Sequence, residues 1–308
     1  MTDLIRATFD EAKERAEMRG DEYRYGRIAK DLAAVPLAVR KRYLPDGIVQ
    51  TNDVMDTYGC ASRSPVLIAK AKLTYLYHNG MHPELRKWLR SAHMIGGKAY
   101  SYVSGEKENA KVIVDETFIE ILSGTTPSGN SLKAPLQAIH DYGLIPECLP
   151  LEAGMTWEEY MDRGRITEEM LELGREFNKR LRFYFEQVAR GGFEEARNDD
   201  FLDVALYAWH SPRQDGTYWS DSDDRPNHAV PEINNDILLQ DSYEPHLKTL
   251  EKNYQHFEWG YSLSIPFQNP LLKEAAPDAT AKKKAWLMAI IEAGAAAVKW
   301  LLLFFKRV

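Results

Sequence analysis

The stretch RPNHAVPEINNDILLQDSYEP, residues 225 to 245, places a histidine and an acidic residue beside two short apolar runs. His228 leads the run HAV, and Asp241 follows the run ILLQ. Both runs favour β-structure and turn residues separate them, so we expect two strands. If the strands pair antiparallel, the two side chains lie near one another. The stretch therefore predicts either a catalytic pair or a surface hairpin with an isolated histidine, and a nucleophile elsewhere in the chain would favour the pair.

Cys60 is the candidate nucleophile. It lies in GIVQTNDVMDTYGCASRSPVLIAKAKL, residues 47 to 73, just before a helical pattern over residues 61 to 78. A thiol at a helix start is close to the positive end of the helix dipole, which favours the thiolate. A proline cannot donate an N–H inside a helix, so Pro65 predicts that the helix begins a few residues after Cys60. The histidine and the acid of the opening stretch would take the thiol proton and orient the ring.

Each of these three residues also has an ordinary structural interpretation. A lone cysteine is most often a small apolar core residue. A histidine beside alanine and valine is more often a hydrogen-bonded strand residue than a base, and an aspartate before a serine is most often a turn residue. The catalytic interpretation therefore depends on all three occurring together.

The composition excludes several classes of protein. The chain has 308 residues, enough for one large domain or two small ones, and a net charge of −7, which argues against a nucleic-acid binder. Its two cysteines, Cys60 and Cys148, provide no disulfide framework, so we expect free thiols in a reducing compartment such as the cytoplasm. The N-terminus lacks the apolar core of a signal peptide. His210, His246 and His256 have no metal-ligand spacing, so we expect neither a metal nor a cofactor.

Helical patterns dominate the first two thirds of the chain, and strand patterns dominate the next quarter. This segregation predicts an α+β protein with two unlike halves. The helical patterns cover residues 2 to 42, 61 to 78, 134 to 147 and 166 to 190. The strand patterns cover residues 201 to 210, 228 to 233, 236 to 243 and 259 to 267.

The order of these motifs resembles the papain-like cysteine peptidases. In that family a cysteine at a helix start precedes a histidine in a segment like NHAV, and an asparagine then follows in a segment like ILLQDSY. Three further stretches, LPDGIVQTND, ILSGTTPSGNSLKAPLQAIHDYGLIPE and WGYSLSI, resemble family segments in the same order. The resemblance covers roughly residues 43 to 267. Compact divergent members of the family occur in bacteriophages, so the resemblance also fits a bacteriophage virion protein.

The resemblance implies a fold and an activity. We expect a papain-like domain over residues 43 to 268, with a helical half (about 43 to 200) packed against a β-rich half (about 201 to 268). Between the halves, a Cys60 thiolate paired with His228 would attack a peptide or isopeptide carbonyl of a protein or peptide substrate, and Asp241 would orient His228.

The backbone N–H of Cys60 would hold the oxyanion, together with the side chain of Gln50 or of its rival Asn52.

The chain also departs from the family pattern. Ala61 stands where the family has an aromatic residue near the nucleophile, and Gln50 lies further from the cysteine than the family's glutamine does. Asp241 stands in place of the asparagine, and we expect it to accept the Nδ1 proton of His228 and to stabilise the imidazolium. Tyr243 stands in place of the tryptophan that shields this pair.

The two ends form separate segments. The sequence of residues 1 to 42 predicts a helical extension or an inhibitory pro-segment. The sequence of residues 269 to 284 predicts a linker. Residues 285 to 308 form an apolar, basic-flanked tail helix that would contact a membrane or dock on protein. Glu292 and Lys299 interrupt its apolar run, so insertion as a single helix is close to break-even.

Three functions follow from the sequence. The first is a cysteine peptidase with a Cys-His-Asp trio. The second is a catalytically inactive papain-like structural or virion component, which would keep the fold without the chemistry. The third is a membrane-active protein that acts through its C-terminal helix.

Overall fold

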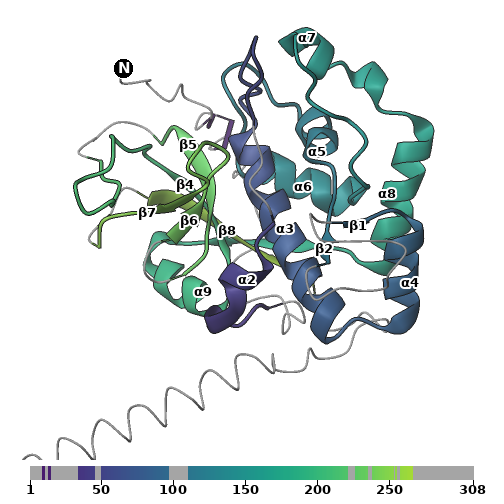
Figure 1. The fold of residues 1–308 in the computed structure, drawn as a ribbon, viewed down its shortest axis with the longest axis horizontal. Coiled ribbons are helices and arrows are strands. Elements are labelled where there is room, and N and C mark those ends of the chain that lie inside the picture. The colour runs from purple at the N-terminus through teal and green to yellow at the C-terminus, as the bar shows by residue number, and fades with distance from the viewer. Residues whose placement is uncertain are drawn as a thin grey trace, which may run out of the picture.

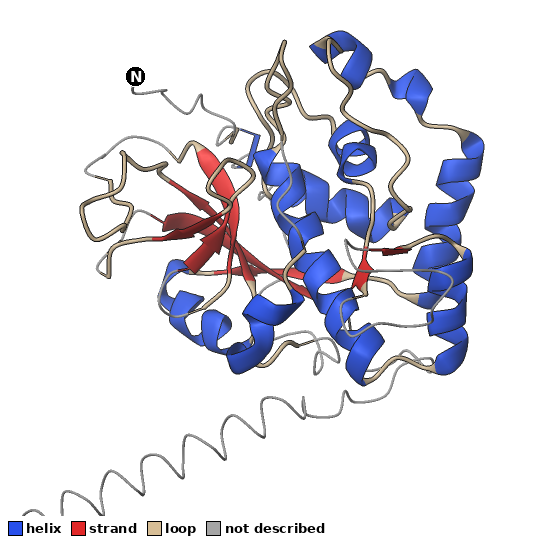
Figure 2. Cartoon of the chain, in the orientation of Figure 1, coloured by secondary structure: helices blue, strands red, loops and turns tan. Residues whose placement is uncertain are grey.

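The computed structural model combines helices with one large sheet (Figures 1 and 2). The helix α3 lies between the sheet on one side and the remaining large helices on the other (Figure 1). This arrangement agrees with a mixed helix-and-sheet fold that has two unlike sides. The structure describes residues 9–10, 13–14, 34–45, 50–96, 110–220, 226–234, 238–252, 254 and 257–265.

Helix α3, Cys60–Asn79, is the centre of the fold, and its residues 60 to 77 are all buried. The prediction that it begins after Cys60 is wrong, because the N–H groups of Ser62 and Arg63 already donate to the Gly59 carbonyl, at 3.0 and 2.9 Å. Pro65 lies inside the helix and removes one backbone hydrogen bond. Packing around a helix buried on every side outweighs that loss.

Six strands form the sheet, and every neighbouring pair is antiparallel. Each predicted strand segment overlaps one of these strands, although β8 begins two residues before its predicted segment, and β7 was not predicted. The sheet order is β3 (Tyr184–Val188), β8 (Phe257–Ser264), β4 (Leu202–Leu206), β5 (His228–Glu232), β6 (Leu238–Gln240) and β7 (Leu247–Thr249).

The predicted helix over residues 166 to 190 is wrong in its second half. Helix α8, Glu168–Arg180, ends there, and the chain continues into β3. Beyond Arg180 the sequence is rich in aromatic residues, which suit strands, and β3 pairs along its whole length with β8. Sheet pairing therefore overrides the helical spacing, and the sheet takes its first strand from the segment assigned to the helical half.

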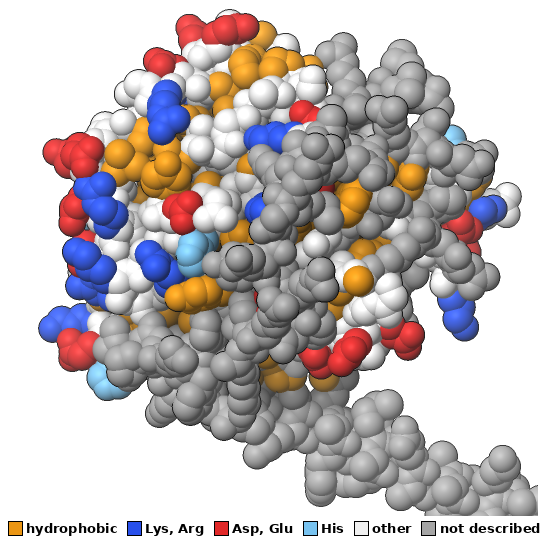
Figure 3. Space-filling view, turned by 180° about the vertical axis from the view of Figure 1, so that it is seen from behind, with side chains coloured by type: hydrophobic (Ala, Val, Ile, Leu, Met, Phe, Trp, Pro, Cys, Tyr) orange, Lys and Arg blue, Asp and Glu red, His pale blue; other side chains and the backbone are white. Residues whose placement is uncertain are grey.

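The other helices are shorter, and several of them pack directly against α3. Acidic and basic side chains are interspersed on the outer surface (Figure 3), and along α8 they form exposed ion pairs such as Arg175 with Glu168. The remaining elements are α2 (Arg40–Tyr43), α4 (Pro83–Ser91), α5 (Glu116–Ser123), α6 (Lys133–Tyr142), α7 (Trp157–Tyr160) and α9 (Phe193–Asp199), with a small pair of strands, β1 (Ile95–Gly96) and β2 (Lys111–Val112), and 3-10 turns at Leu37–Val39, Arg163–Arg165 and Arg190–Gly192.

Both faces of the sheet are covered. On β4, Ala205 belongs to the large apolar cluster that contains much of α3, whereas Val204 and Leu206 belong to a smaller cluster on the opposite face. All of β4 and β5 is buried as a result. The sheet thus holds β5 rigidly against α3, with which it packs.

The described parts of residues 1 to 42 dock on the rest of the chain. The buried guanidinium of Arg40 donates to carbonyls of other segments, including that of Ile233 at 3.1 Å. The buried carboxylate of Glu14 accepts from the Leu132 N–H at 2.7 Å and from the Tyr261 hydroxyl at 2.6 Å. Whether this region acts as an extension or a pro-segment stays a prediction.

The predicted linker, residues 269 to 284, and the predicted tail helix, residues 285 to 308, lie outside the described residues. Among the helices that the structure describes, none has the length and apolar character to cross a bilayer.

Gly59, which precedes α3, offers a test of the packing at the helix start. A Cβ at Gly59 would lie 1.8 Å from Glu120 Oε1, and Glu120 is held by Arg63 and Tyr160, both at 2.6 Å. We expect Gly59→Ala to lower the free energy of unfolding by about 1–3 kcal/mol, as overpacking does. Urea unfolding measures this. Gly191→Ala is the control, since no described atom lies within 4 Å of its Cβ, and equal losses in both variants would contradict the packing argument.

Candidate active site

Cys60 is the first residue of α3, and its side chain is 1% exposed. An ion pair lies behind it in the first turns of the helix. Arg63 Nε donates to Glu120 Oε1 at 2.6 Å, and the Tyr160 hydroxyl donates to Glu120 Oε2 at 2.6 Å. All three side chains are buried, and the charge of Glu120 and its hydrogen bond raise the pKa of Arg63 although burial alone would lower it. This closed network fixes the end of α3 that carries the thiol.

His228 is the first residue of β5, and its ring is held by the acid predicted for it. Nε2 of His228 donates to Oδ1 of Asp241 at 2.9 Å, and both residues are 0% exposed. The prediction that Asp241 takes the Nδ1 proton is therefore wrong. Asp241 follows β6 and reaches the ring from the side of Nε2, so that Nδ1 is the nitrogen left for another partner.

Cys60 is the second group that acts on the ring. Among the described residues, Nδ1 of His228 has no hydrogen-bond partner of ordinary geometry. Burial alone would lower the pKa of His228, but the charges of Asp241 and Cys60, the hydrogen bond to Asp241 and a polar contact with Cys60 raise it to about 10. The structure thus brings Cys60, His228 and Asp241 together in the predicted order, from thiol to imidazole to carboxylate.

Asp241 is fixed by more than the histidine. Its Oδ1 also accepts from the Tyr243 N–H at 3.1 Å, and its Oδ2 accepts from Lys248 Nζ at 2.6 Å. Burial would raise the pKa of Asp241, but the charge and hydrogen bond of His228, followed by those of Lys248, hold it below its ordinary value. Asp241 is therefore a buried carboxylate with cationic partners on both oxygens.

Two aromatic rings flank the imidazole. The ring of Tyr243 lies 5.7 Å from that of His228 between centroids, in agreement with its predicted position over the pair. The ring of Trp209 lies 5.5 Å away, edge to face. Sequence patterns single out neither Trp209 nor Lys248, because a tryptophan after a strand and a lysine within one are ordinarily packing and surface residues.

Gln50 lies in the same region, but its amide is already engaged. Its Nε2 donates to Asp56 Oδ1 at 3.0 Å and to the Tyr243 hydroxyl, and its Oε1 accepts from the Ser242 hydroxyl at 2.5 Å. The Tyr243 hydroxyl in turn donates to Asp56. Both N–H groups of Gln50 are thus used within the protein. Its role as oxyanion donor stays a prediction that requires one of these bonds to be exchanged.

The rival donor, Asn52, is engaged away from the trio. Its Nδ2 donates to the carbonyls of Glu152 and Met155 at 2.8 and 3.0 Å, and its Oδ1 accepts from the N–H groups of Val54 and Met55. The first two bonds tie the loop that precedes α3 to the loop of residues 152 to 155, and the other two close a turn within it. Asn52 therefore serves the loop in this structure, and Gln50 is the better placed of the two.

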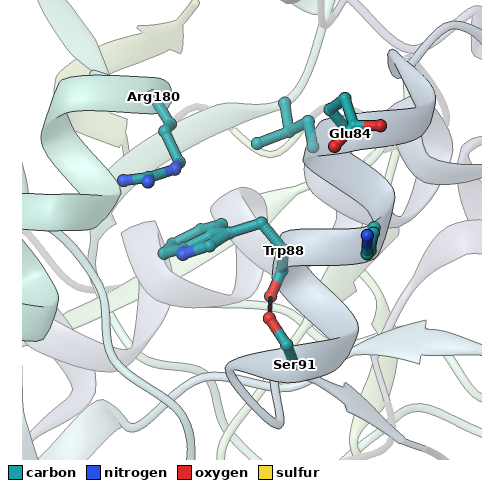
Figure 4. A pocket seen from close by; sticks show the side chains of 6 residues that line it. Glu84, Trp88, Ser91 and Arg180 are labelled. Carbon is teal, nitrogen blue, oxygen red and sulfur yellow. Dashed lines mark hydrogen bonds between the residues drawn. The ribbon is translucent and has the colours of Figure 1, made fainter.

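The trio is closed to solvent, since Cys60, His228 and Asp241 are all at most 1% exposed. A surface pocket lies between α4 and α8 instead, where the Arg180 guanidinium lies 4.8 Å from the Trp88 ring (Figure 4). The trio therefore presents almost no exposed surface to a substrate. The pocket between α4 and α8 is lined by Glu84, Leu85, Lys87, Trp88, Ser91 and Arg180.

The chain is similar in structure to solved cysteine proteases. One is the proform of Amb a 11, a cysteine protease and major ragweed pollen allergen, with 12% identity and a TM-score of 0.47, covering 84% of this chain and 75% of that one. A second structure of that proform gives 11% identity and the same TM-score, with 86% and 77% covered. Xylellain, a cysteine protease from Xylella fastidiosa, gives 12% identity and a TM-score of 0.42, with 80% and 97% covered. No protein-family model and no curated protein matches the sequence.

The raised pKa of His228 predicts how stability depends on pH. In the unfolded chain the ring titrates near 6.5, whereas in the fold it titrates at about 10. The contribution of the protonated ring is therefore full below about pH 6.5 and is lost as the pH rises through about 10. Asp241→Asn removes the largest cause of the raised pKa, so its stability should fall less steeply between pH 7 and 10 than that of the wild type.

Urea unfolding at several pH values measures both slopes. Asp141→Asn, at an exposed position, is the matched control and should keep the wild-type slope. Parallel curves for the wild type and Asp241→Asn would show that the His228–Asp241 contact contributes nothing to the pH dependence.

Proposed function

We propose that this protein is a papain-like cysteine peptidase that cleaves peptide or isopeptide bonds with Cys60, His228 and Asp241. The observation that carries the proposal is the orientation of the imidazole. Nε2 of His228 is bonded to a buried carboxylate, which leaves Nδ1 to the thiol at the start of a helix. One buried cluster would thus supply a nucleophile, a base and a group that orients the base.

The reaction would proceed in two steps. The Cys60 thiolate attacks the carbonyl carbon, a C–S bond forms, and the C–N bond breaks as protonated His228 gives its proton to the leaving amine. Water then attacks the thioester, His228 takes a proton from the water, and the acid product leaves as the C–S bond breaks. Asp241 stabilises the imidazolium in both steps and is not consumed.

The oxyanion of each step would be held by the N–H at the start of α3 and by the Gln50 amide. Gln50 is bonded to the hydroxyls of Tyr243 and Ser242, the second and first residues after Asp241. If one N–H of Gln50 left its protein partner to bond the oxyanion, substrate binding would be coupled to the loop that holds Ser242 and Tyr243.

The burial of the trio defines the alternative. A papain-like protein that has lost its chemistry, such as a structural or virion component, would keep the same buried cluster and never open it. Contact with a membrane or a protein partner through residues 285 to 308, in a cytoplasmic or virion setting, is a separate proposal that flotation of the full chain and of a chain ending at residue 284 on liposomes would test.

Alkylation of Cys60 across pH tests the peptidase proposal. A small neutral haloacetamide on a Cys148→Ser background labels Cys60 alone, since these are the only two cysteines. We expect the wild type to react at pH 6 at least about tenfold faster than His228→Ala, because a thiol of ordinary pKa, near 8.5, is mostly protonated there. Cys60→Ala should abolish labelling and the hydrolysis of a peptide pool.

Two results would contradict the proposal. One is a Cys60 that reacts as an ordinary thiol and is insensitive to His228→Ala. The other is a Cys60 that stays unreactive at every pH while the protein remains folded, which favours the inert scaffold.

A further inference from the structure

Lys248 is a buried lysine in the strand β7, and it is only 3% exposed. A lysine ammonium has three N–H donors, and all three of Lys248 are used. It donates to Asp241 Oδ2 at 2.6 Å, to the Tyr243 carbonyl at 2.7 Å and to the Pro245 carbonyl at 2.8 Å. Lys248 therefore holds the acid of the trio and also the backbone of the loop that follows it.

The pairing of Lys248 with Asp241 offsets the cost of burying a charge. Removing a carboxylate from water is strongly unfavourable unless cations and hydrogen bonds surround it. An amide at the same position could bond the imidazole without this cost, because it carries no charge. With His228 on Oδ1 and Lys248 on Oδ2, each oxygen of the carboxylate has a cationic neighbour.

Aromatic rings cover the ammonium on the side of the smaller apolar cluster. Lys248 Nζ lies 5.5 Å from the centroid of the Trp209 ring and 5.6 Å from that of Tyr218. Trp209 also packs against the His228 ring. The same tryptophan thus contacts the histidine and the lysine, and it keeps both on the side of Asp241.

We propose that Lys248 is a positioning residue of the candidate active site. Lys248 fixes the Asp241 carboxylate and balances its charge. The buried carboxylate can then orient His228, as an uncharged amide at the same position would. The proposal rests on the proposed function, because a residue that positions the trio matters to catalysis only if the trio is active. Lys248 touches neither the thiol nor a substrate and acts through Asp241.

The other titratable groups around Asp241 and His228 come from three parts of the fold. Cys60 approaches from α3, Tyr218 from the loop after β4, and Tyr243 and His246 from the loop between β6 and β7. The charge of Asp241 contributes to raising the pKa of Tyr218, after burial, and His246 Nδ1 lies 3.0 Å from the Asp241 carbonyl. Among the described lysine and arginine residues, Lys248 is the one that forms an ion pair with the Asp241 carboxylate, at 2.6 Å.

A double-mutant cycle on the full chain tests the proposal. The variants are Lys248→Met, Asp241→Asn and the two together, in the Cys148→Ser background. Methionine fills the space under Trp209 without a charge, and asparagine removes the charge that Lys248 balances. The readouts are the midpoint of the His228 ring titration by NMR, assigned with His228→Gln, and the hydrolysis rate of a peptide pool. Lys252→Met, at an exposed lysine, is the matched control.

Lys248→Met should raise the His228 midpoint by at least about 0.4 pH, because the imidazolium loses a cationic neighbour while Asp241 stays charged. Each single variant should slow hydrolysis, and the double variant should be at least about fivefold faster than the product of the two effects predicts, since it restores charge balance. Lys252→Met should change neither readout.

A residue with a merely structural role would give another result. Lys248→Met would then lower the melting temperature but leave the His228 midpoint unmoved, or the two substitutions would combine within about twofold of additivity, and either result overturns the proposal. If the wild type hydrolyses nothing and His228→Ala does not change the alkylation rate of Cys60, the proposed function fails. The titration midpoint still decides, in that case, whether Lys248 positions the histidine–aspartate pair.

Discussion

The hydrogen bond between His228 Nε2 and Asp241 Oδ1 is the contact on which the candidate site depends. It joins the start of β5 to the residue after β6, and it can exist in a buried place only because each partner has a second stabilising neighbour. His228 has Cys60, and Asp241 has Lys248. The sheet supports this contact by burying β5 on both faces and packing it against α3. The architecture therefore brings the start of a helix and residues in or directly after three neighbouring strands to a single point.

Local signals in the sequence singled out the three residues that the structure brings together. A cysteine before a helical pattern and two short strands with a histidine and an acid indicated Cys60, His228 and Asp241 jointly, although each residue alone has an ordinary structural interpretation. The short range of the signal also explains the errors. Residues 181 to 190 have spacing that suits a helix, and only the pairing of residues 184 to 188 with β8, far along the chain, makes those five a strand. Pro65 likewise predicts a later helix start, because the burial that stabilises α3 around it is not visible in a local window.

The surroundings of the trio could not be predicted for a related reason. Lys248 and Trp209 matter through contacts with residues on other strands, and nothing in their own neighbourhood of sequence distinguishes them from surface or packing residues. The order of residues along the chain also does not determine which histidine nitrogen faces the acid, because this depends on the orientation of the ring. Gln50 was identified by its type and approximate place, but its partners Tyr243 and Ser242 lie more than half the chain away.

The position of β8 has a consequence for how the chain is made. It is the last strand that the structure describes, yet it lies inside the sheet, between β3 and β4. Its Tyr261 also holds the carboxylate of Glu14, near the other end of the chain. A growing chain can therefore complete neither the sheet nor this contact until residue 264 has left the ribosome, and until then β3 and β4 carry unpaired edges. Folding that waits for a late strand exposes such edges to other chains, so this protein should depend on slow release or on a chaperone during synthesis more than a protein built from local contacts would.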